Sequence, residues 1–289
     1  MATTAQWVEG ARPRTLPAAL SPVLVGTGVA AAVNGARLDR AVLALIVALA
    51  LQIGVNYAND YSDGIRGTDD VRVGPLRLVG SGAAAPKAVL AAALAAFAVA
   101  AVAGLVLALL TSPLLLVVGA AALFAAWGYT GGKRPYGYRG LGEVSVFVFF
   151  GLVAVIGTTY VQTGHLSLLA LAGGVASGAL ACSILVTNNL RDIPTDSVSG
   201  KQTLAVRIGD QQTRRLYTLL IVLPFVVTVI VAPARPGALL ALVALPLAVG
   251  PVRIVRSGAT GRDLVAALKG TGQLQLVYGV LLGLGFALF

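Results

Sequence analysis

The segment AVLALIVALALQIGV, Ala41 to Val55, runs without a break into NYANDYSDGIRGTDD, Asn56 to Asp70. Its first half is almost entirely apolar, and its second half holds four of the chain's eleven acidic residues. A membrane-crossing helix requires about 20 apolar residues, and a carboxylate near hydrocarbon is costly unless it is paired, hydrated or bound to a cation. The segment therefore predicts a membrane helix that ends in a polar site.

The composition of the whole chain is typical of a membrane protein. Of its 289 residues, 57% are hydrophobic and 11% are charged, with a mean hydropathy of +0.89. A water-soluble protein could not keep this much apolar surface away from water, whereas a bilayer acts as its solvent. The single cysteine, Cys182, excludes an internal disulfide and a thiolate metal cage, and the single histidine, His165, argues against a histidine metal site.

Nine apolar runs predict an all-α integral membrane protein with nine transmembrane helices around a central cavity. The runs cover residues 16–33, 41–59, 88–110, 113–131, 142–161, 166–188, 213–232, 236–254 and 270–289. We expect one polytopic membrane domain over residues 1–289. The N-terminal segment lacks the pattern of a cleavable signal peptide, so the first run is expected to remain as a helix.

Basic residues alternate between the loops, and this pattern indicates the orientation of the chain. The N-terminal segment and the loops after the second, fourth, sixth and eighth runs hold 18 of the 21 Lys and Arg residues. The remaining three are Arg37, Arg40 and Arg235. Because basic loops stay on the cytoplasmic side, we expect the N-terminus inside and the C-terminus outside. The protein is expected in the cell membrane, with a cavity that opens to the cytoplasm. The net charge of +10 is spread over five segments without a nucleic-acid-binding module, so no nucleic acid is expected as a partner.

The first polar cluster lies at the predicted cytoplasmic end of its run. Asn56, Asn59, Asp60 and Asp63 are spaced 0, 3, 4 and 7, which places all four on one face of a helix. A second cluster, NNLRDIPTDSVSGK from Asn188 to Lys201, follows another apolar run on the same predicted side. These two faces are expected to converge on one cavity.

The second cluster has a similar spacing. Asn188, Asp192 and Asp196 are spaced 0, 4 and 8, which gives one face if the helix continues. Pro194 is expected to distort that turn, because proline removes a backbone donor and disfavours a helical residue before it.

Oxygen-rich faces of this kind suit a hard cation. Mg²⁺ is commonly held by one or two carboxylates together with phosphate oxygens, so a split site with a pyrophosphate between its halves fits the pattern. The basic neighbours that would neutralise the remaining phosphate oxygens are Arg66, Arg72, Arg77, Arg191 and Lys201. The alternative is that the carboxylates only balance the basic loops, but ionisable groups clustered at membrane helix ends favour a functional site.

Several motifs resemble a known family. NDYSDGIRGTDD followed by VGPLRLVGSG, and NNLRDIPTDSVSGKQTLAVRIG, resemble the two signature regions of the UbiA superfamily of intramembrane aromatic prenyltransferases. ARPRTLPAALSPVLVGTG and YTGGKRPYGYRGLGE resemble its subgroup that prenylates 1,4-dihydroxy-2-naphthoate in menaquinone biosynthesis. The chain departs from the superfamily pattern at Gly67, where Asp is usual, and Asp69 and Asp70 follow instead.

The resemblance implies transfer of a polyprenyl group from polyprenyl diphosphate to 1,4-dihydroxy-2-naphthoate, with loss of CO₂ and diphosphate, to give demethylmenaquinone. Mg²⁺ is the implied cofactor. The expected metal ligands are Asn56, Asn59, Asp60, Asp63, Asp192 and Asp196, and the four Asp together with Lys201 are the expected catalytic residues. The expected diphosphate ligands are Arg66, Arg72, Arg77, Lys133, Arg191 and Lys201. Further metal or substrate contacts are expected from Asp69, Asp70, Asn188 and Tyr138.

Two alternatives stay open at this point. A related prenyltransferase would use another aromatic acceptor, such as hydroxybenzoate, homogentisate or haem. A cation-coupled transporter would also place polar groups among membrane helices, but transporters bind near the membrane midplane between repeated halves. Here the clusters follow the apolar runs, and the sequence shows no clear internal repeat.

Overall fold

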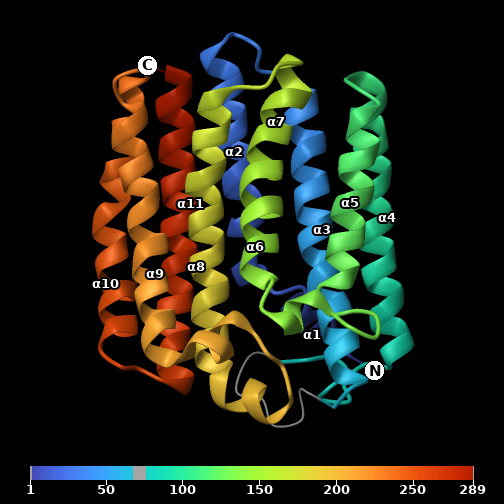
Figure 1. Cartoon of the computed structure of the whole chain (residues 1–289). Coiled ribbons are helices and arrows are strands. Elements are labelled where there is room, and N and C mark those ends of the chain that lie inside the picture. Colours follow the sequence, from blue (N-terminus) through green and yellow to red (C-terminus); the bar gives the residue numbers. More distant parts are fainter. Residues whose placement is uncertain (1, 68–75, 289) are drawn as a thin grey trace.

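A computed structural model of the chain describes residues 2–67 and 76–288, and the regular structure in these ranges is helical. Figure 1 shows the long helices side by side in one bundle, with the N-terminus at one end and the C-terminus at the other. The ends of α3 (Leu38–Gly64) and α8 (Leu168–Val198), which carry the two polar clusters, lie at the same end as the N-terminus. The expected all-α class is confirmed.

The other helices follow the predicted runs. The chain begins with α1 (Thr4–Gly10), η1 (Pro13–Thr15) and α2 (Pro17–Ala32), and after α3 come α4 (Pro86–Leu110), α5 (Leu114–Gly128) and η2 (Tyr136–Arg139). One continuous span is made of α6 (Gly142–Val146), the π-helical segment η3 (Phe147–Val153) and α7 (Ala154–Thr163). After α8 come α9 (Leu204–Val231), η4 (Pro236–Ala244), α10 (Leu245–Arg256), η5 (Gly261–Asp263) and α11 (Leu264–Leu288).

The number of spans differs from the expected nine. Within the described ranges, seven helices are long and apolar enough to cross a membrane, and the bent pair Thr4–Thr15 and Pro17–Ala32 raises the number to at most eight. The remaining run is α5, which has 15 residues. At 1.5 Å per residue, such a helix is about 22 Å long, which is less than the ~30 Å hydrocarbon core. Nine full spans are therefore not confirmed.

Several boundaries differ from the sequence prediction, most of all the end of α8 and the start of α9. The helix α8 continues through Pro194 to Val198, so the second polar cluster remains helical. The helix α9 begins at Leu204 rather than near residue 213, because Gly209 (φ 78°, ψ 171°) joins a short first part to the long apolar part. Glycine adopts this left-handed φ without the steric penalty of a side chain. The bend turns the chain at the end of the bundle where α8 finishes.

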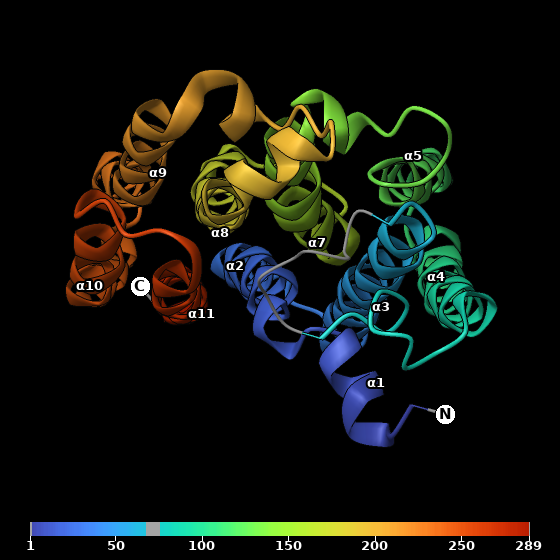
Figure 2. The ribbon, with the colours of Figure 1, turned by 90° about the horizontal axis from the view of Figure 1, so that it is seen from below.

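The helix α2 lies at the centre of the bundle. It packs along α11 and contacts α3, α7 and α8, and Figure 2 shows it between α3 on one side and α8 and α11 on the other. Small residues allow this close packing. A Cβ atom built on Gly28 of α2 would lie 2.2 Å from the backbone oxygen of Gly283 in α11, so the two backbones are in direct contact.

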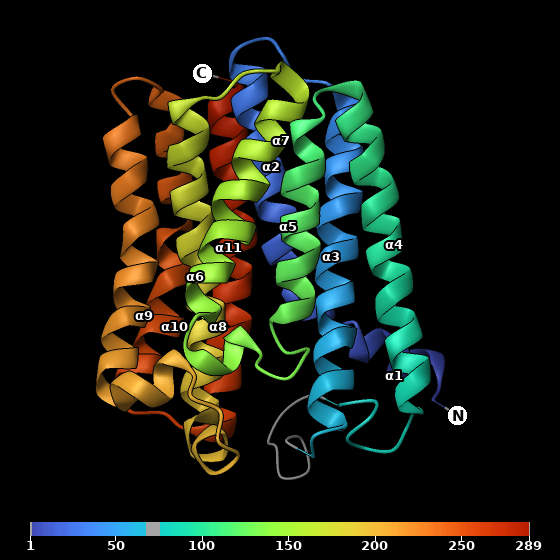
Figure 3. The ribbon, with the colours of Figure 1, turned by 45° about the vertical axis from the view of Figure 1, so that its right-hand side comes forward.

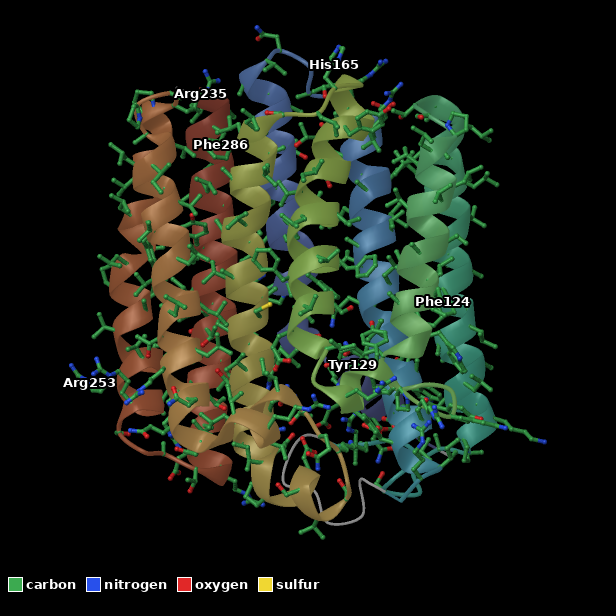
Figure 4. The ribbon with its side chains drawn as sticks, viewed as in Figure 1. Phe124, Tyr129, His165, Arg235, Arg253 and Phe286 are labelled. Carbon is green, nitrogen blue, oxygen red and sulfur yellow. The ribbon has the colours of Figure 1, made fainter. Side chains whose placement is uncertain are left out.

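Two of the three arginines outside the basic loops bind helix ends. Arg40 donates to the carbonyls of Val161 (2.6 Å) and Leu110 (2.9 Å), and Arg235 donates to those of Phe286 (2.9 Å) and Ala32 (3.1 Å). Figure 4 shows Arg235 and Phe286 close together at the end of the bundle opposite the polar clusters. The last carbonyls of a helix lack intrahelical partners and carry partial negative charge, so these guanidinium groups stabilise several helix ends at once.

The contact between α2 and α11 can be tested by adding one methyl group. Gly28→Ala should lower the melting temperature, because overpacking of this kind costs about 1–3 kcal/mol. Gly250→Ala is the matched control, since a Cβ atom there meets nothing within 4 Å and alanine favours the helix. Thermal unfolding in detergent measures both variants, and equal melting temperatures would contradict the packing.

Candidate active site

A cavity of about 1290 Å³ lies within the bundle. Figure 3 shows α5 beside the α6–α7 span on the near side, with α2 and α3 behind them, and all of these elements contribute lining residues. Most of the lining is apolar, and includes Ala48, Leu51, Gly104, Leu105, Leu116, Phe149, Phe150 and Val153. The polar part of the lining includes the predicted residues Asn56, Asn59, Asp63, Arg77, Tyr138, Asn188, Arg191, Asp192, Asp196 and Lys201. Both polar clusters therefore open into one cavity.

Asp63 connects three separate segments of the chain. It is 4% exposed, and its carboxylate accepts a hydrogen bond from the Tyr138 hydroxyl. Its oxygens also lie 3.5 Å from Lys201 Nζ and 3.8 Å from Arg77 Nη2. A buried carboxylate requires such partners, because removal from water is costly. Lys201 follows the second cluster, so an ion pair links the two acidic segments directly.

The Tyr138 ring lies close to two cations. Lys201 Nζ is 4.7 Å from the ring centroid and Arg66 Cζ is 5.6 Å from it. Cations at these distances are attracted to the face of an aromatic ring. Tyr138 thus contacts Asp63 and Lys201, and its expected contact with metal or substrate stays a prediction.

The end of α8 places Lys201. Gly200 has φ +75°, and the Lys201 amide donates to the Asp196 carbonyl at 2.9 Å, while the Ser199 amide donates to the Thr195 carbonyl at 3.0 Å. The bond from Lys201 across a left-handed glycine is that of a Schellman C-cap. It turns the chain back so that Lys201 lines the cavity. The residue is 8% exposed.

Asp192 forms a bidentate pair with the residue before it. Arg191 Nε and Nη2 donate to its two carboxylate oxygens, each at 2.7 Å. Arg191 is 6% exposed and Asp192 is 8% exposed, so both are largely shielded from water. Two parallel bonds of this kind fix the plane of the carboxylate. Asp196 lies one helical turn further along α8 and lines the same cavity.

The two asparagines of the first cluster bind neighbouring loops. Asn59 accepts a hydrogen bond from the Thr130 hydroxyl at 2.6 Å. Asn56 donates to the Ala11 carbonyl at 2.9 Å and to the Thr15 hydroxyl at 3.0 Å. Both amides line the cavity, but their contacts hold the segments that surround it.

Asp60 lies behind the cavity lining rather than in it. It is fully buried, and its carboxylate accepts hydrogen bonds from the backbone amides of Leu78 (2.8 Å) and Val79 (3.0 Å). The expected metal ligand therefore anchors the chain next to Arg77, which in turn reaches Asp63. The sequence spacing predicted the shared helix face but not this loop.

Two expected diphosphate ligands lie away from the cavity lining. Arg66 donates to the backbone carbonyls of Ser62, Thr130 and Gly132 and so fixes the loop after α5. Lys133 is exposed. Asp69, Asp70 and Arg72 fall outside the described residues.

Sequence reasoning missed several polar residues of the cavity. Asn189 lines it and donates to Glu143 Oε1 at 2.9 Å. Tyr136 donates to the Ala125 carbonyl at 2.7 Å and lies 2.8 Å from the Ser145 hydroxyl. Burial raises the pKa of Tyr136, and the hydrogen bond with Ser145 opposes the shift.

Arg12 and Arg14 also line the cavity. They lie in the motif ARPRTLP, which carries part of the family resemblance, and that motif was the signal available in the sequence.

The carboxylates do not form a ready-made metal cage. Among residues 2–67 and 76–288, no group of three or more His, Cys, Asp or Glu side chains is close enough to hold a metal ion. Instead, Asp63 and Asp192 each contact a cationic side chain. The carboxylates lie on two walls of one cavity, and a ligand between the walls would be needed to complete a metal site.

Comparison with known proteins gives consistent matches. The model of the UbiA prenyltransferase family matches residues 19–287. A 1,4-dihydroxy-2-naphthoate octaprenyltransferase of Mycobacterium tuberculosis is 57% identical, over 97% of this chain and 96% of that protein. The Escherichia coli protein of the same name is 40% identical, over 75% of this chain and 73% of that protein.

Solved structures share the fold. A UbiA homologue from Archaeoglobus fulgidus bound to DMAPP and Mg²⁺ superposes with a TM-score of 0.67 at 15% identity, over 98% of this chain and 100% of that chain. An apo UbiA homologue from Aeropyrum pernix gives a TM-score of 0.69 at 17% identity, over 93% of this chain and 96% of that chain.

The C-cap that places Lys201 can be tested with a pair of glycine variants. Gly200→Ala and Gly258→Ala each put a side chain at a positive φ (+75° and +87°) without a steric contact within 4 Å. Each should lose about 1–2 kcal/mol of stability from the left-handed backbone. Only Gly200→Ala should also lower enzymatic turnover, because only Gly200 precedes Lys201. Equal turnover in the two variants would show that the position of Lys201 is unimportant.

Proposed function

This chain belongs to the UbiA prenyltransferase family, and we propose that the two acidic walls of its cavity bind the diphosphate of a polyprenyl donor between them. The enzyme transfers the polyprenyl group to 1,4-dihydroxy-2-naphthoate, in menaquinone synthesis, with release of CO₂ and diphosphate to give demethylmenaquinone. Its relatives of that name support this acceptor. The observation that carries the site is the convergence of Asp63, Asp192 and Asp196 on one cavity.

The donor set is suited to Mg²⁺. Every metal-ligating side chain that we assign to the cavity presents oxygen: the ligands are Asp63, Asp192 and Asp196, with Asn59 and Asn188 beside them. Mg²⁺ takes one or two carboxylates together with phosphate oxygens, so two walls that each supply a carboxylate fit it without a complete protein cage. When bound, Mg²⁺ would stabilise the negative charge that builds on the departing diphosphate.

The cations beside the carboxylates have a second role in this proposal. Arg77, Lys201 and Arg191 contact Asp63 or Asp192 and are mostly buried, so they can donate to phosphate oxygens with little competition from water. Donors aimed at developing charge in a dry site stabilise the transition state. We assign Asp60 and Arg66 to holding the loops that carry Arg77 and Tyr138.

The apolar part of the cavity suits the rest of the donor. Loss of diphosphate leaves an allylic carbocation, which water would quench, and the apolar lining excludes water. Leu105 and Leu116 line the cavity and are also 46% and 48% exposed, so its apolar part reaches the outer surface of α4 and α5. The polyprenyl tail can follow this path among the helices or into lipid. Attack on the cation by the ring carbon that bears the carboxylate, with loss of CO₂, completes the transfer.

We place the site at the cytoplasmic face of the cell membrane. The N-terminus and the ends of α3 and α8 lie at one end of the bundle, and predicted basic loops follow those helix ends in the sequence. The chain would thus take both substrates from the inner leaflet and the cytoplasm.

Acceptor assays test the function. Purified protein with one radiolabelled polyprenyl diphosphate should form a labelled product with 1,4-dihydroxy-2-naphthoate, and release diphosphate, only when Mg²⁺ is present. Turnover of hydroxybenzoate or homogentisate without turnover of the naphthoate would overturn the acceptor. Absence of diphosphate release with every acid, together with cation flux in vesicles, would favour a transporter instead.

Two carboxylate variants test the shared site. Asp63→Asn and Asp192→Asn should each lower kcat by about 100-fold or more, because each removes charge from the group that stabilises the leaving diphosphate. Asp263→Asn is the control, since Asp263 is exposed and does not line the cavity. Thermal unfolding checks that the variants fold. Activity close to that of the unmodified enzyme in either site variant would remove that residue from the site.

A further inference from the structure

Arg12 has a backbone conformation that non-glycine residues rarely adopt. Its φ is 52° and its ψ is 68°, in the left-handed region. Asn34 is the only other non-glycine residue with positive φ in the described ranges, and asparagine tolerates this region far better than arginine. Strained residues of this kind persist where the surrounding structure holds them and are concentrated at binding sites.

The guanidinium of Arg12 has an unused donor. Arg12 lines the cavity, and its Nη2 atom is buried without a hydrogen-bond partner among the described residues. A buried donor without a partner is uncommon in proteins, and a charged one is especially costly. An anion bound in the cavity would give this donor a partner.

Residues of α3 hold the turn that carries Arg12. The Thr15 hydroxyl donates to the Arg12 carbonyl at 2.9 Å and accepts from Gln52 Nε2 at 2.8 Å and Asn56 Nδ2 at 3.0 Å. Asn56 also donates to the carbonyl of Ala11, the residue before Arg12. The network therefore fixes the backbone on both sides of the strained residue.

The surroundings of Arg12 favour a carboxylate on an aromatic ring over a diphosphate. Asn56, which holds the Arg12 turn, precedes Asp63 by seven residues on α3, or about 10 Å along a helix. Among the described residues, Arg77 and Lys201 lie within 4 Å of the Asp63 carboxylate, at the acidic walls. Near the Arg12 turn, α3 contributes Leu51 and Val55 to the lining, which suit a flat apolar ring.

We propose that Arg12 binds the carboxylate of the aromatic acceptor, and that Asn56 and Thr15 are positioning residues for it. This proposal rests on the proposed function, because it names the group that recognises the acceptor acid. It gives Asn56 a role in the acceptor half of the cavity rather than in the metal site.

Steady-state kinetics with each substrate varied separately test the proposal. Arg12→Gln should raise the KM for 1,4-dihydroxy-2-naphthoate by about 10- to 100-fold, the range expected for a lost charged hydrogen bond. The KM for polyprenyl diphosphate should stay within about twofold. Arg253→Gln is the matched control, because Arg253 is exposed on the outside of α10, as Figure 4 shows. Its kinetics should match those of the unmodified enzyme.

A binding measurement separates the carboxylate from the ring. The unmodified enzyme should bind 1,4-dihydroxy-2-naphthoate about 10- to 100-fold more tightly than 1,4-dihydroxynaphthalene, which lacks the carboxylate. Arg12→Gln should bind both about equally. If Arg12→Gln raises the KM for the diphosphate instead, or changes neither KM, the proposal is wrong. If the unmodified enzyme does not turn over the naphthoate at all, the proposed function itself is wrong, and this outcome is distinct from a failure of the Arg12 proposal alone.

Two further variants guard against a purely structural explanation. Arg12→Gly should fold at least as stably as the unmodified enzyme, because glycine adopts the left-handed φ without strain, yet it should show the same acceptor defect. Asn56→Ala should raise the KM for the naphthoate without changing the Mg²⁺ concentration needed for half-maximal activity. A shifted Mg²⁺ requirement would instead place Asn56 at the metal and contradict its positioning role.

Discussion

The ion pair between Asp63 and Lys201 joins the two halves of the site. Asp63 ends a long apolar helix, and Lys201 follows another that begins more than a hundred residues later. A carboxylate buried at that position must be neutralised, and the chain supplies Lys201, Arg77 and the Tyr138 hydroxyl from three different segments. Satisfying one buried charge therefore brings together the end of α3, the loop between α5 and α6, and the segment after α8. The cavity is the space that these segments enclose.

The rest of the bundle keeps that space open. Glycine contacts such as that of Gly28 with Gly283 bring α2 and α11 together on one side, and the guanidinium groups of Arg40 and Arg235 bind helix ends at the far end of the bundle. The helices are thus fixed by packing and by capping away from the cavity, which does not need to be filled with side chains. A reaction with a carbocation intermediate requires polar groups for the leaving diphosphate and an apolar lining that excludes water. The cavity provides both.

The sequence predicted the features that depend on local patterns. Helical spacing placed Asn56, Asn59 and Asp63 on one face of α3, and apolar runs located the long helices but not the polar ends of α8 and α9. Contacts between distant segments left no such pattern. No sequence pattern near Asp60 indicates that its carboxylate accepts hydrogen bonds from the backbone amides of residues 78 and 79. Likewise, no pattern near Arg66 indicates that its guanidinium donates to a carbonyl of the loop after α5. The left-handed backbone conformation of Arg12 could not be predicted either, because contacts with α3 through Thr15 and Asn56 hold it. The short length of α5 and the bend at Gly209 were also not predicted from the sequence.

The central claim is that both acidic walls hold one diphosphate through shared metal ions. A structure determined with Mg²⁺ and an unreactive thiolo analogue of polyprenyl diphosphate tests it most directly. We expect metal density that contacts Asp63 on one side and Asp192 or Asp196 on the other, with the diphosphate between them. Metal and diphosphate bound to one wall alone, with the other wall still occupied only by its own arginine or lysine, would contradict it.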